Sequence, residues 1–287
     1  MSQIYDHRRC ELGEGAFWHP ERQTFLWFDI LDSRLLGRNG DDAVSWKFPQ
    51  YVSAAAWVAD DVILVAGERS LMLYALDEHA VMPLLELEAD KPDNRSNDGR
   101  ADRQGGFWIG TMGKDPQDRK GKGAIYRLYK GEVRTLYPNI SIPNAICFSP
   151  DGTIGYFADT AEQTVWQVAL DADGWPLGER EVYLDFKGTD IYPDGATVDA
   201  EGNFWNAQWG LGRVAAYSPA GDYLRDVTFD APHTSCPAFG GPDLTTLFCT
   251  TALEEMSEEA RAAHPDAGKT FFAENIAKGL PEPRFLA

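Results

Sequence analysis

The stretch AICFSPDGTIGYFADT (145–160) decides the fold of this chain, because altered copies of it recur along the sequence. It reads as an apolar segment, a tight polar turn at PDG and a second segment rich in aromatic residues, which is the pattern of two β-strands joined by a hairpin. Clear copies are ATVDAEGNFWNAQW (196–209) and GRADRQGGFWIGTM (99–112). Weaker copies are AFWHPERQTFLWFDI (16–30), AAWVADDVILVAGE (55–68) and AFGGPDLTTLFCTTA (238–252).

Further strand-like segments follow most of these copies, as in AIYRLYKG (124–131) and then EVRTLYP (132–138). A repeat of roughly 40–50 residues with about four strands is typical of a propeller blade. Six copies fill the chain, so we predict an all-β, six-bladed β-propeller forming a single domain over 1–287. A β-sandwich or barrel with similar strand spacing is the alternative, and the regular repeat disfavours it.

The two ends of the chain fit this count. The last repeat supplies three strands and ends near KTFFAENI (269–276), so we expect Ser2–Arg9 to add its outer strand and close the ring. Closure would remove the open sheet edges that invite aggregation. The one convincing helical segment is Glu254–Ala263.

Composition excludes several classes of protein. With 44% hydrophobic residues the chain can build a core. The net charge of −19 repels phosphate, so neither nucleic acid nor a membrane surface is an expected partner. No apolar run approaches the ~20 residues of a membrane span. The four cysteines form no CxxC pair, and the first residues resemble no signal peptide, so we expect a cytoplasmic protein.

The register of the repeats brings a few polar residues together. In a propeller the first strand of each blade lines a central channel, so equivalent positions before that strand ring one mouth. Four repeats carry an oxygen-bearing side chain there: Glu14, Asn97, Asn144 and Asp194. Two carboxylates and two amides suit a divalent cation such as Ca²⁺, Mg²⁺ or Mn²⁺. Taken singly, each is equally a turn residue before a strand, and it is the shared register that favours a site.

Five motifs together resemble one family over nearly the whole chain. They are LGEGAFW (12–18), RSNDGR (95–100), PNAICFSPDG (143–152), YPDGATVDAEG (192–202) and GGPDLTTLFCTTA (240–252). They are similar to the regucalcin (senescence marker protein), gluconolactonase and luciferin-regenerating family, and nearest to its bacterial sugar lactonases. The PNA motif replaces the SNG common in the family but keeps the asparagine.

The resemblance implies a propeller with one divalent metal in the channel, held by Glu14, Asn144 and Asp194. Ca²⁺ is the first expectation, and Zn²⁺, Mn²⁺, Mg²⁺ or Fe²⁺ also accept such ligands. It places substrate contacts on Arg95 and Asn97, with Asp98 beside them. The expected reaction is hydrolysis of a small sugar-acid lactone, with Asp194 as the first candidate base and Asp98 as the second.

Two other functions remain open at this point. One is a non-catalytic calcium-binding regulatory propeller, and the other is a metal-dependent esterase or phosphotriesterase on the same scaffold. Tyr192 and Trp209 lie near the channel and are read equally well as core residues or as packing surfaces for a sugar ring. The oligomeric state stays open, and a monomer fits the sequence.

Overall fold

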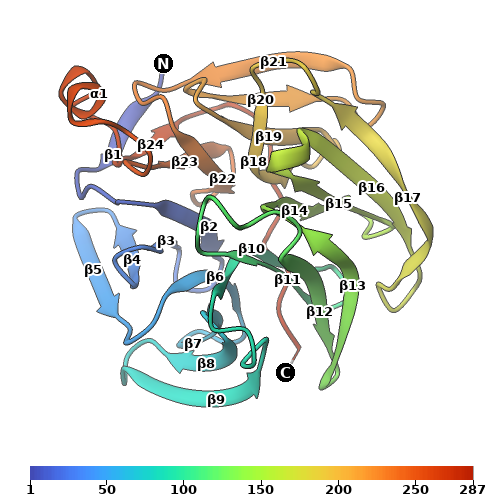
Figure 1. The fold of residues 1–287 in the computed structure, drawn as a ribbon. Helices are drawn as coiled ribbons and strands as arrows, with labels where there is room; N and C mark the ends of the chain where they lie inside the picture. Colours follow the sequence, from blue (N-terminus) through green and yellow to red (C-terminus); the bar gives the residue numbers. More distant parts are fainter. Residues whose placement is uncertain (287) are drawn as a thin grey trace.

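The computed structural model describes residues 1–286, which fold into six four-stranded antiparallel sheets arranged as a ring (Figure 1). This confirms the predicted six-bladed β-propeller. Within blades 1 to 5 the strands run in chain order from the channel outward. Blade 1 consists of β2(Gly13–His19), β3(Thr24–Asp29), β4(Arg34–Asn39) and β5(Asp42–Lys47). Blade 2 consists of β6(Val52–Trp57), β7(Val62–Gly67), β8(Ser70–Ala75) and β9(Ala80–Glu86). Blade 3 consists of β10(Asn94–Ala101), β11(Phe107–Gly113), β12(Gly123–Tyr129) and β13(Glu132–Ile140).

Blade 6 joins the two ends of the chain. Blade 4 consists of β14(Pro143–Phe148), β15(Ile154–Asp159), β16(Thr164–Leu170) and β17(Pro176–Asp185), and blade 5 of β18(Tyr192–Val198), β19(Phe204–Trp209), β20(Arg213–Tyr217) and β21(Tyr223–Thr228). Blade 6 consists of β22(Thr234–Gly240), β23(Thr246–Thr251) and β24(Thr270–Ala273) from the end of the chain and β1(Gln3–Asp6) from its beginning. β1 pairs antiparallel with β24, placing Gln3 opposite Phe272. The predicted ring closure by the N-terminal segment is therefore confirmed.

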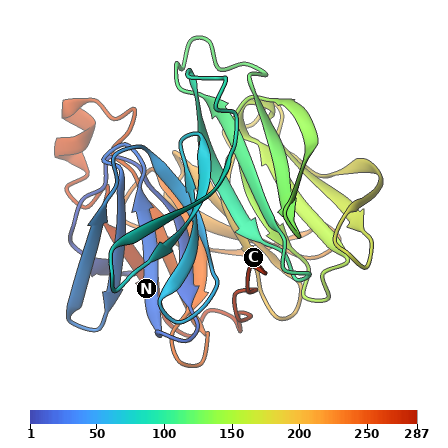
Figure 2. The ribbon, with the colours of Figure 1, turned by 90° about the horizontal axis from the view of Figure 1, so that it is seen from below.

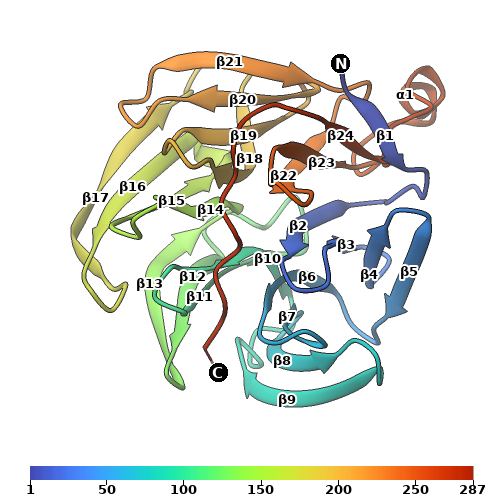
Figure 3. The same cartoon turned by 180° about the vertical axis from the view of Figure 1, so that it is seen from behind.

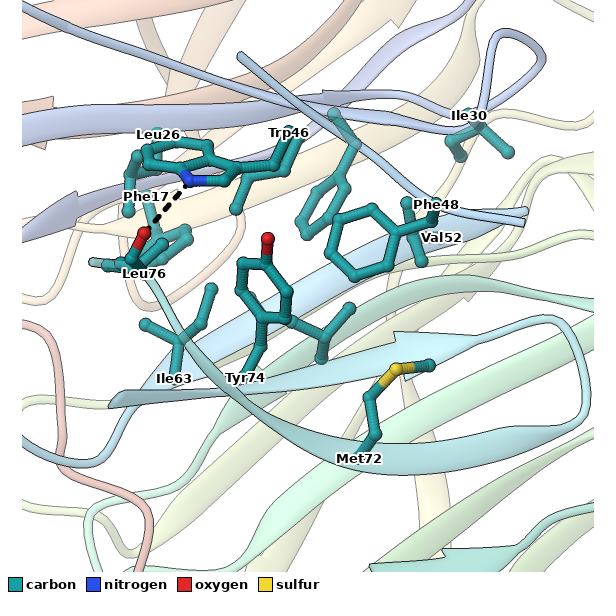
Figure 4. Packing of buried hydrophobic residues seen from close by; sticks show 14 of the residues in the cluster. Phe17, Leu26, Ile30, Trp46, Phe48, Val52, Ile63, Met72, Tyr74 and Leu76 are labelled. Carbon is teal, nitrogen blue, oxygen red and sulfur yellow. Dashed lines mark hydrogen bonds between the residues drawn. The ribbon is translucent and has the colours of Figure 1, made fainter. Parts of the chain in front are cut away.

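The hydrophobic core lies between neighbouring blades rather than at one centre. Figure 4 shows the cluster between blades 1 and 2, where Phe17 and Leu26 face Ile63 and Tyr74. Trp46 belongs to the same cluster and donates its indole N–H to the carbonyl of Leu76 at 3.0 Å. Burying such aromatic and aliphatic surface is the main favourable term that holds adjacent sheets together.

All six innermost strands are irregular at the equivalent place. The pairing of β2, β6, β10, β14, β18 and β22 with the second strand of its blade is interrupted by a register shift. Such a bulge leaves a residue unpaired and redirects its side chain, and it is frequent next to active sites. The bulges include the positions that the repeat register marked, such as Glu14 and Asp194.

The predicted helix is shorter than expected. α1 covers Glu258–Ala263, whereas the sequence predicted a helix from residue 254. Glu255 adopts a left-handed backbone (φ 63°), which a right-handed helix cannot continue through. Ser257 then caps the helix by accepting a hydrogen bond from the Ala260 N–H. Within residues 1–286 no helix combines the length and the apolar character that a bilayer crossing requires.

The residues after β24 cross the back of the ring (Figure 3). Figure 2 shows α1 and this C-terminal segment on opposite sides of the propeller. Glu282 forms an ion pair with the buried Arg100, and Trp57 donates its indole N–H to the Glu282 carbonyl at 2.8 Å. Phe285 is buried in the core between blades 2 and 3. The segment therefore covers the rear end of the channel.

Candidate active site

A cavity of about 310 Å³ lies at one end of the channel. It contains five of the six residues that the sequence marked as site residues. Its walls come from blades 1, 3, 4, 5 and 6 and their loops, and it is lined by Leu12, Glu14, Arg95, Asn97, Met112, Arg119, Ile142, Asn144, Thr160, Ala161, Tyr192, Asp194, Trp209, Glu254 and Glu255.

Backbone conformation directs the polar side chains into this cavity. Glu14 and Asn144 are each followed by a residue with a left-handed backbone, Gly15 at φ 58° and Ala145 at φ 57°. Both residues lie in the bulges of their strands. Without the bulge, side chains would alternate strictly between the two faces of the sheet. The local twist instead turns Glu14 and Asn144 toward the channel axis.

Glu14 and Asp194 form a buried pair of acids, with only 6% and 4% of their surface exposed. Their carboxyl groups lie close enough to hydrogen-bond to each other. Burial, reinforced by the charge of Asp98, raises the pKa of Glu14 to about 8. Burial and the charge of Glu14 raise the pKa of Asp194 well above its usual value. Neither acid forms a salt bridge with any residue in 1–286.

A chain of amide hydrogen bonds fixes the third oxygen donor. Asn97 donates its Nδ2–H to Asn144 Oδ1 at 3.1 Å, and Asn144 donates its own Nδ2–H to Thr160 Oγ1 at 2.8 Å. Thr160 then donates to the Pro193 carbonyl at 2.6 Å, one residue before Asp194. These bonds hold the Asn144 amide with its oxygen available on the side of the cavity, since a carbonyl oxygen has two lone pairs.

The donor set fits a divalent cation. Two buried carboxylates without a direct ion-pair contact are costly, and a bound cation would replace the proton that otherwise neutralises them. Carboxylate and amide oxygens are the ligands of hard cations. No group of three or more His, Cys, Asp or Glu side chains at metal-binding spacing occurs among the described residues. That finding agrees with a set in which the third ligand is an asparagine.

Arg95 supplies a buried cation beside these acids. Its Nη1 donates to Asn97 Oδ1 at 2.7 Å and to the Ser96 carbonyl at 2.9 Å. Burial lowers the pKa of Arg95, while the nearby charge of Glu254 raises it. The guanidinium keeps further N–H donors that face the cavity, and its rigid fork suits an oxygen-rich ligand.

Asp98 does not line this cavity. Its Oδ2 accepts a hydrogen bond from the backbone N–H of Ile146 at 2.7 Å, and it borders a small void on the far side of the bulge with Arg100 and Glu282. Burial raises the pKa of Asp98 to about 6. The observed contact supports the strand that carries Asn144. A role for Asp98 as a base stays a prediction.

Several lining residues were not assigned to the site from the sequence. Arg119 belongs to the basic loop 114–122, which rises on the same side of the ring as α1 (Figure 2). Glu254 and Glu255 were read as helix but lie in the turn before it. Thr160 follows the last residue of β15 and is found only through its bond to Asn144. These residues come from loops, whose position the repeat does not fix.

Comparisons with known proteins agree over the whole chain. The family model described as the SMP-30/Gluconolactonase/LRE-like region matches residues 12–253. A putative sugar lactone lactonase of Rhizobium meliloti is 39% identical over 279 residues, covering 96% of this chain and 94% of that protein. The L-arabinolactonase of Azospirillum brasilense is 33% identical over 282 residues, covering 96% and 93%.

A solved structure matches equally well. It is a calcium-binding protein, regucalcin, from Agrobacterium tumefaciens, with a TM-score of 0.97 and 39% identity, covering 100% of this chain and 98% of that one. Fold and similarity agree with the resemblance carried by the five motifs. The chain belongs to the SMP-30/gluconolactonase/LRE-like family.

Proposed function

We propose that this protein hydrolyses a sugar-acid lactone to the open aldonic acid, using one divalent cation held by Glu14, Asn144 and Asp194. The observation that carries the proposal is the buried pair of acids that lines one cavity with an oriented asparagine oxygen. The names of the relatives, which include an L-arabinolactonase and a putative sugar lactone lactonase, support a lactone as substrate. The name of the calcium-binding structural neighbour supports Ca²⁺ as the first candidate.

The residues of the cavity have different roles in the proposed hydrolysis. Glu14, Asn144 and Asp194 would hold the divalent cation, which would supply Lewis-acid activation of the carbonyl and of the attacking water. Arg95 donates hydrogen bonds to the lactone oxygens from the guanidinium nitrogens that its protein contacts leave free. Asn97 is held in place by Arg95 and by the carbonyl of Pro143 and adds an orienting amide. A carboxylate oxygen of Asp194 accepts the proton of the attacking water and returns it to the ring oxygen as the ester C–O bond breaks. Asp194 is preferred over Asp98 because only Asp194 lines the cavity.

The four cysteines are free and buried, which supports a reducing compartment such as the cytoplasm. A small neutral or weakly charged lactone suits a cavity whose lining includes both arginine and glutamate side chains.

The proposal is tested with a panel of aldonolactones in a pH-indicator assay, with and without a chelator. We expect acid release that disappears on chelation and returns with added Ca²⁺ or Mn²⁺. Asp194→Asn should lower kcat/KM at least about 100-fold because both the cation and the base are affected. Asp190→Asn is the matched control, since Asp190 is exposed and lies outside the cavity.

Each other outcome identifies a different function. Cation binding without turnover of any lactone would leave a binding protein. Turnover restricted to aryl esters or phosphotriesters would indicate an esterase on the same scaffold. Full activity of Asp194→Asn would remove Asp194 from the mechanism.

A further inference from the structure

Three aromatic rings lie in a row at the cavity end of blades 5 and 6. Tyr192 and Trp209 are directly opposed in the pairing of β18 with β19, and Trp209 forms a separate bridge with His233. Tyr192 and Trp209 line the cavity, whereas His233 is behind them. The row therefore presents aromatic surface to the same space as Glu14 and Asp194.

The position of Trp209 is fixed from behind. Its ring stacks on the imidazole of His233, with ring centroids 4.2 Å apart and planes inclined by 17°. His233 Nδ1 bonds the carbonyl of Glu254 at 3.0 Å, and since a carbonyl only accepts, the Nδ1–H is the donor. Burial lowers the pKa of His233, so the imidazole is neutral at pH 7 and stacks without a charge. Tyr192, in contrast, is 45% exposed and has no such support.

Trp209 also keeps an unused donor. Within residues 1–286 its indole N–H donates to no protein acceptor, although the side chain is half-buried. The indole N–H groups of Trp18, Trp27 and Trp108 also lack a partner, but they are buried in the core, whereas Trp209 lines the cavity. An aromatic wall with a free N–H matches a sugar, which has an apolar C–H face and hydroxyl groups at its edge.

We infer that Trp209 is the residue against which the sugar ring packs, that its N–H binds a ring hydroxyl, and that His233 is the positioning residue that holds it. This inference rests on the proposed function, because it names the part of the same cavity that recognises the sugar. The polar wall of Arg95 and Asn97 then meets the lactone oxygens, while the indole meets the ring itself. The indole thus offers packing surface to the ring, while Arg95, Asn97 and the indole N–H offer hydrogen-bond donors to the oxygens of a cyclic polyol ester.

The test compares kcat and KM for the best lactone of the panel, on the cation-loaded protein. Trp209→Ala should raise KM about tenfold and leave kcat within about twofold, because it removes binding surface and no reacting group. Trp209→Phe keeps a ring and should raise KM only about threefold. Trp166→Phe is the matched control and should change neither value, since Trp166 packs on Phe157 and Arg180 in blade 4.

His233 is tested by two variants that separate its two contacts. His233→Phe keeps a ring to stack on and should keep KM close to that of the wild type. His233→Asn keeps a donor for the Glu254 carbonyl but loses the ring, and it should raise KM with unchanged Ca²⁺ affinity by calorimetry. Equal KM for His233→Asn and wild type would overturn the positioning role.

Unchanged KM for both Trp209 variants would overturn the inference while leaving the lactonase proposal intact. If Trp209→Ala does not fold, the KM of Trp209→Phe decides alone. If the wild type hydrolyses no lactone, the proposed function fails, and calorimetric binding of the intact, cyclic lactones of the panel then decides the role of Trp209. Weaker binding by Trp209→Ala than by wild type supports it, whereas equal binding, or no binding to wild type, overturns it.

Discussion

At the scale of single residues, the folded protein buries two acids, Glu14 and Asp194, in surroundings that disfavour their charged forms. Both are buried, and burial raises the pKa of each; the charge of Glu14 further raises the pKa of Asp194, and the charge of Asp98 that of Glu14. A carboxyl whose pKa is higher in the folded state than in the unfolded chain opposes folding when the pH is above its unfolded pKa. The acid pair therefore lowers the free energy of unfolding of the metal-free protein, and binding of the proposed cation should raise it again.

This gives a prediction for the pH dependence of the metal-free protein. The pKa of Glu14 rises from its usual 4.5 to about 8 on folding. Between these values the folded state holds a proton that the unfolded state has lost, so stability falls as the pH rises, by up to about 1.4 kcal/mol per pH unit. Urea unfolding of chelated wild type and Glu14→Gln between pH 5 and 8 measures the difference.

We expect Glu14→Gln to lose less stability than wild type over this range. Added Ca²⁺ should stabilise wild type more at pH 8 than at pH 6, because the cation competes with the proton. Parallel curves for the two proteins would show that Glu14 is already ionised without a cation.

At the scale of elements, the bulge in each innermost strand decides where the site lies. The repeat in the sequence identified Glu14, Asn97, Asn144 and Asp194, because equivalent positions in equivalent strands must converge on one axis. The same repeat did not identify Glu254 as a site residue, and it left open whether Trp209 belongs to the core or to the site. The first lies in a turn that interrupts an expected helix, and the second acquires its role from stacking on His233, a contact between blades.

Gly15 and Ala145 test the bulge directly. They share almost the same left-handed φ, yet a Cβ on Gly15 would lie 2.2 Å from the Ser53 carbonyl oxygen. Gly15→Ala should therefore lower the free energy of unfolding by at least about 2 kcal/mol and weaken Ca²⁺ binding. Ala145→Gly is the matched variant and should change stability by less than about 1 kcal/mol. Chemical denaturation and calorimetry measure both effects, and an equally stable Gly15→Ala would contradict the packing described.

At the scale of the whole molecule, the sequence predicted the ring and its closure but not the cover on its rear end. The repeat predicts blades, whereas the residues after β24 repeat nothing and take their place by contacts with several blades. Glu282 enters the channel from that side and pairs with Arg100. The pair lies on the opposite side of Asp98 from the cavity.

Glu282→Ala should therefore lower the stability of the protein without changing its affinity for the lactone. It leaves the buried Arg100 without its partner, and the free energy of unfolding should fall by about 3 kcal/mol. KM for the lactone should stay unchanged, because Glu282 does not line the cavity. Glu274→Ala, at an exposed position of the same segment, is the control. A large rise in KM for Glu282→Ala would mean that the rear cover also shapes the cavity.

The pairing of β1 with β24 has a consequence for biosynthesis. A ribosome adds about 5–20 residues per second, and β1 must wait without its partner until residues 270–273 have been made. Glu14 lies in blade 1 and Asp194 in blade 5, and blade 6 stands between them in the ring. The two acids consequently reach their final separation only after blade 6 is complete. The inner strand of blade 6, β22, contacts both β2 and β18. A nascent chain arrested before β22 should therefore hold five blades in which the two acids have not yet met, and the proposed cation would bind only after the ring has assembled.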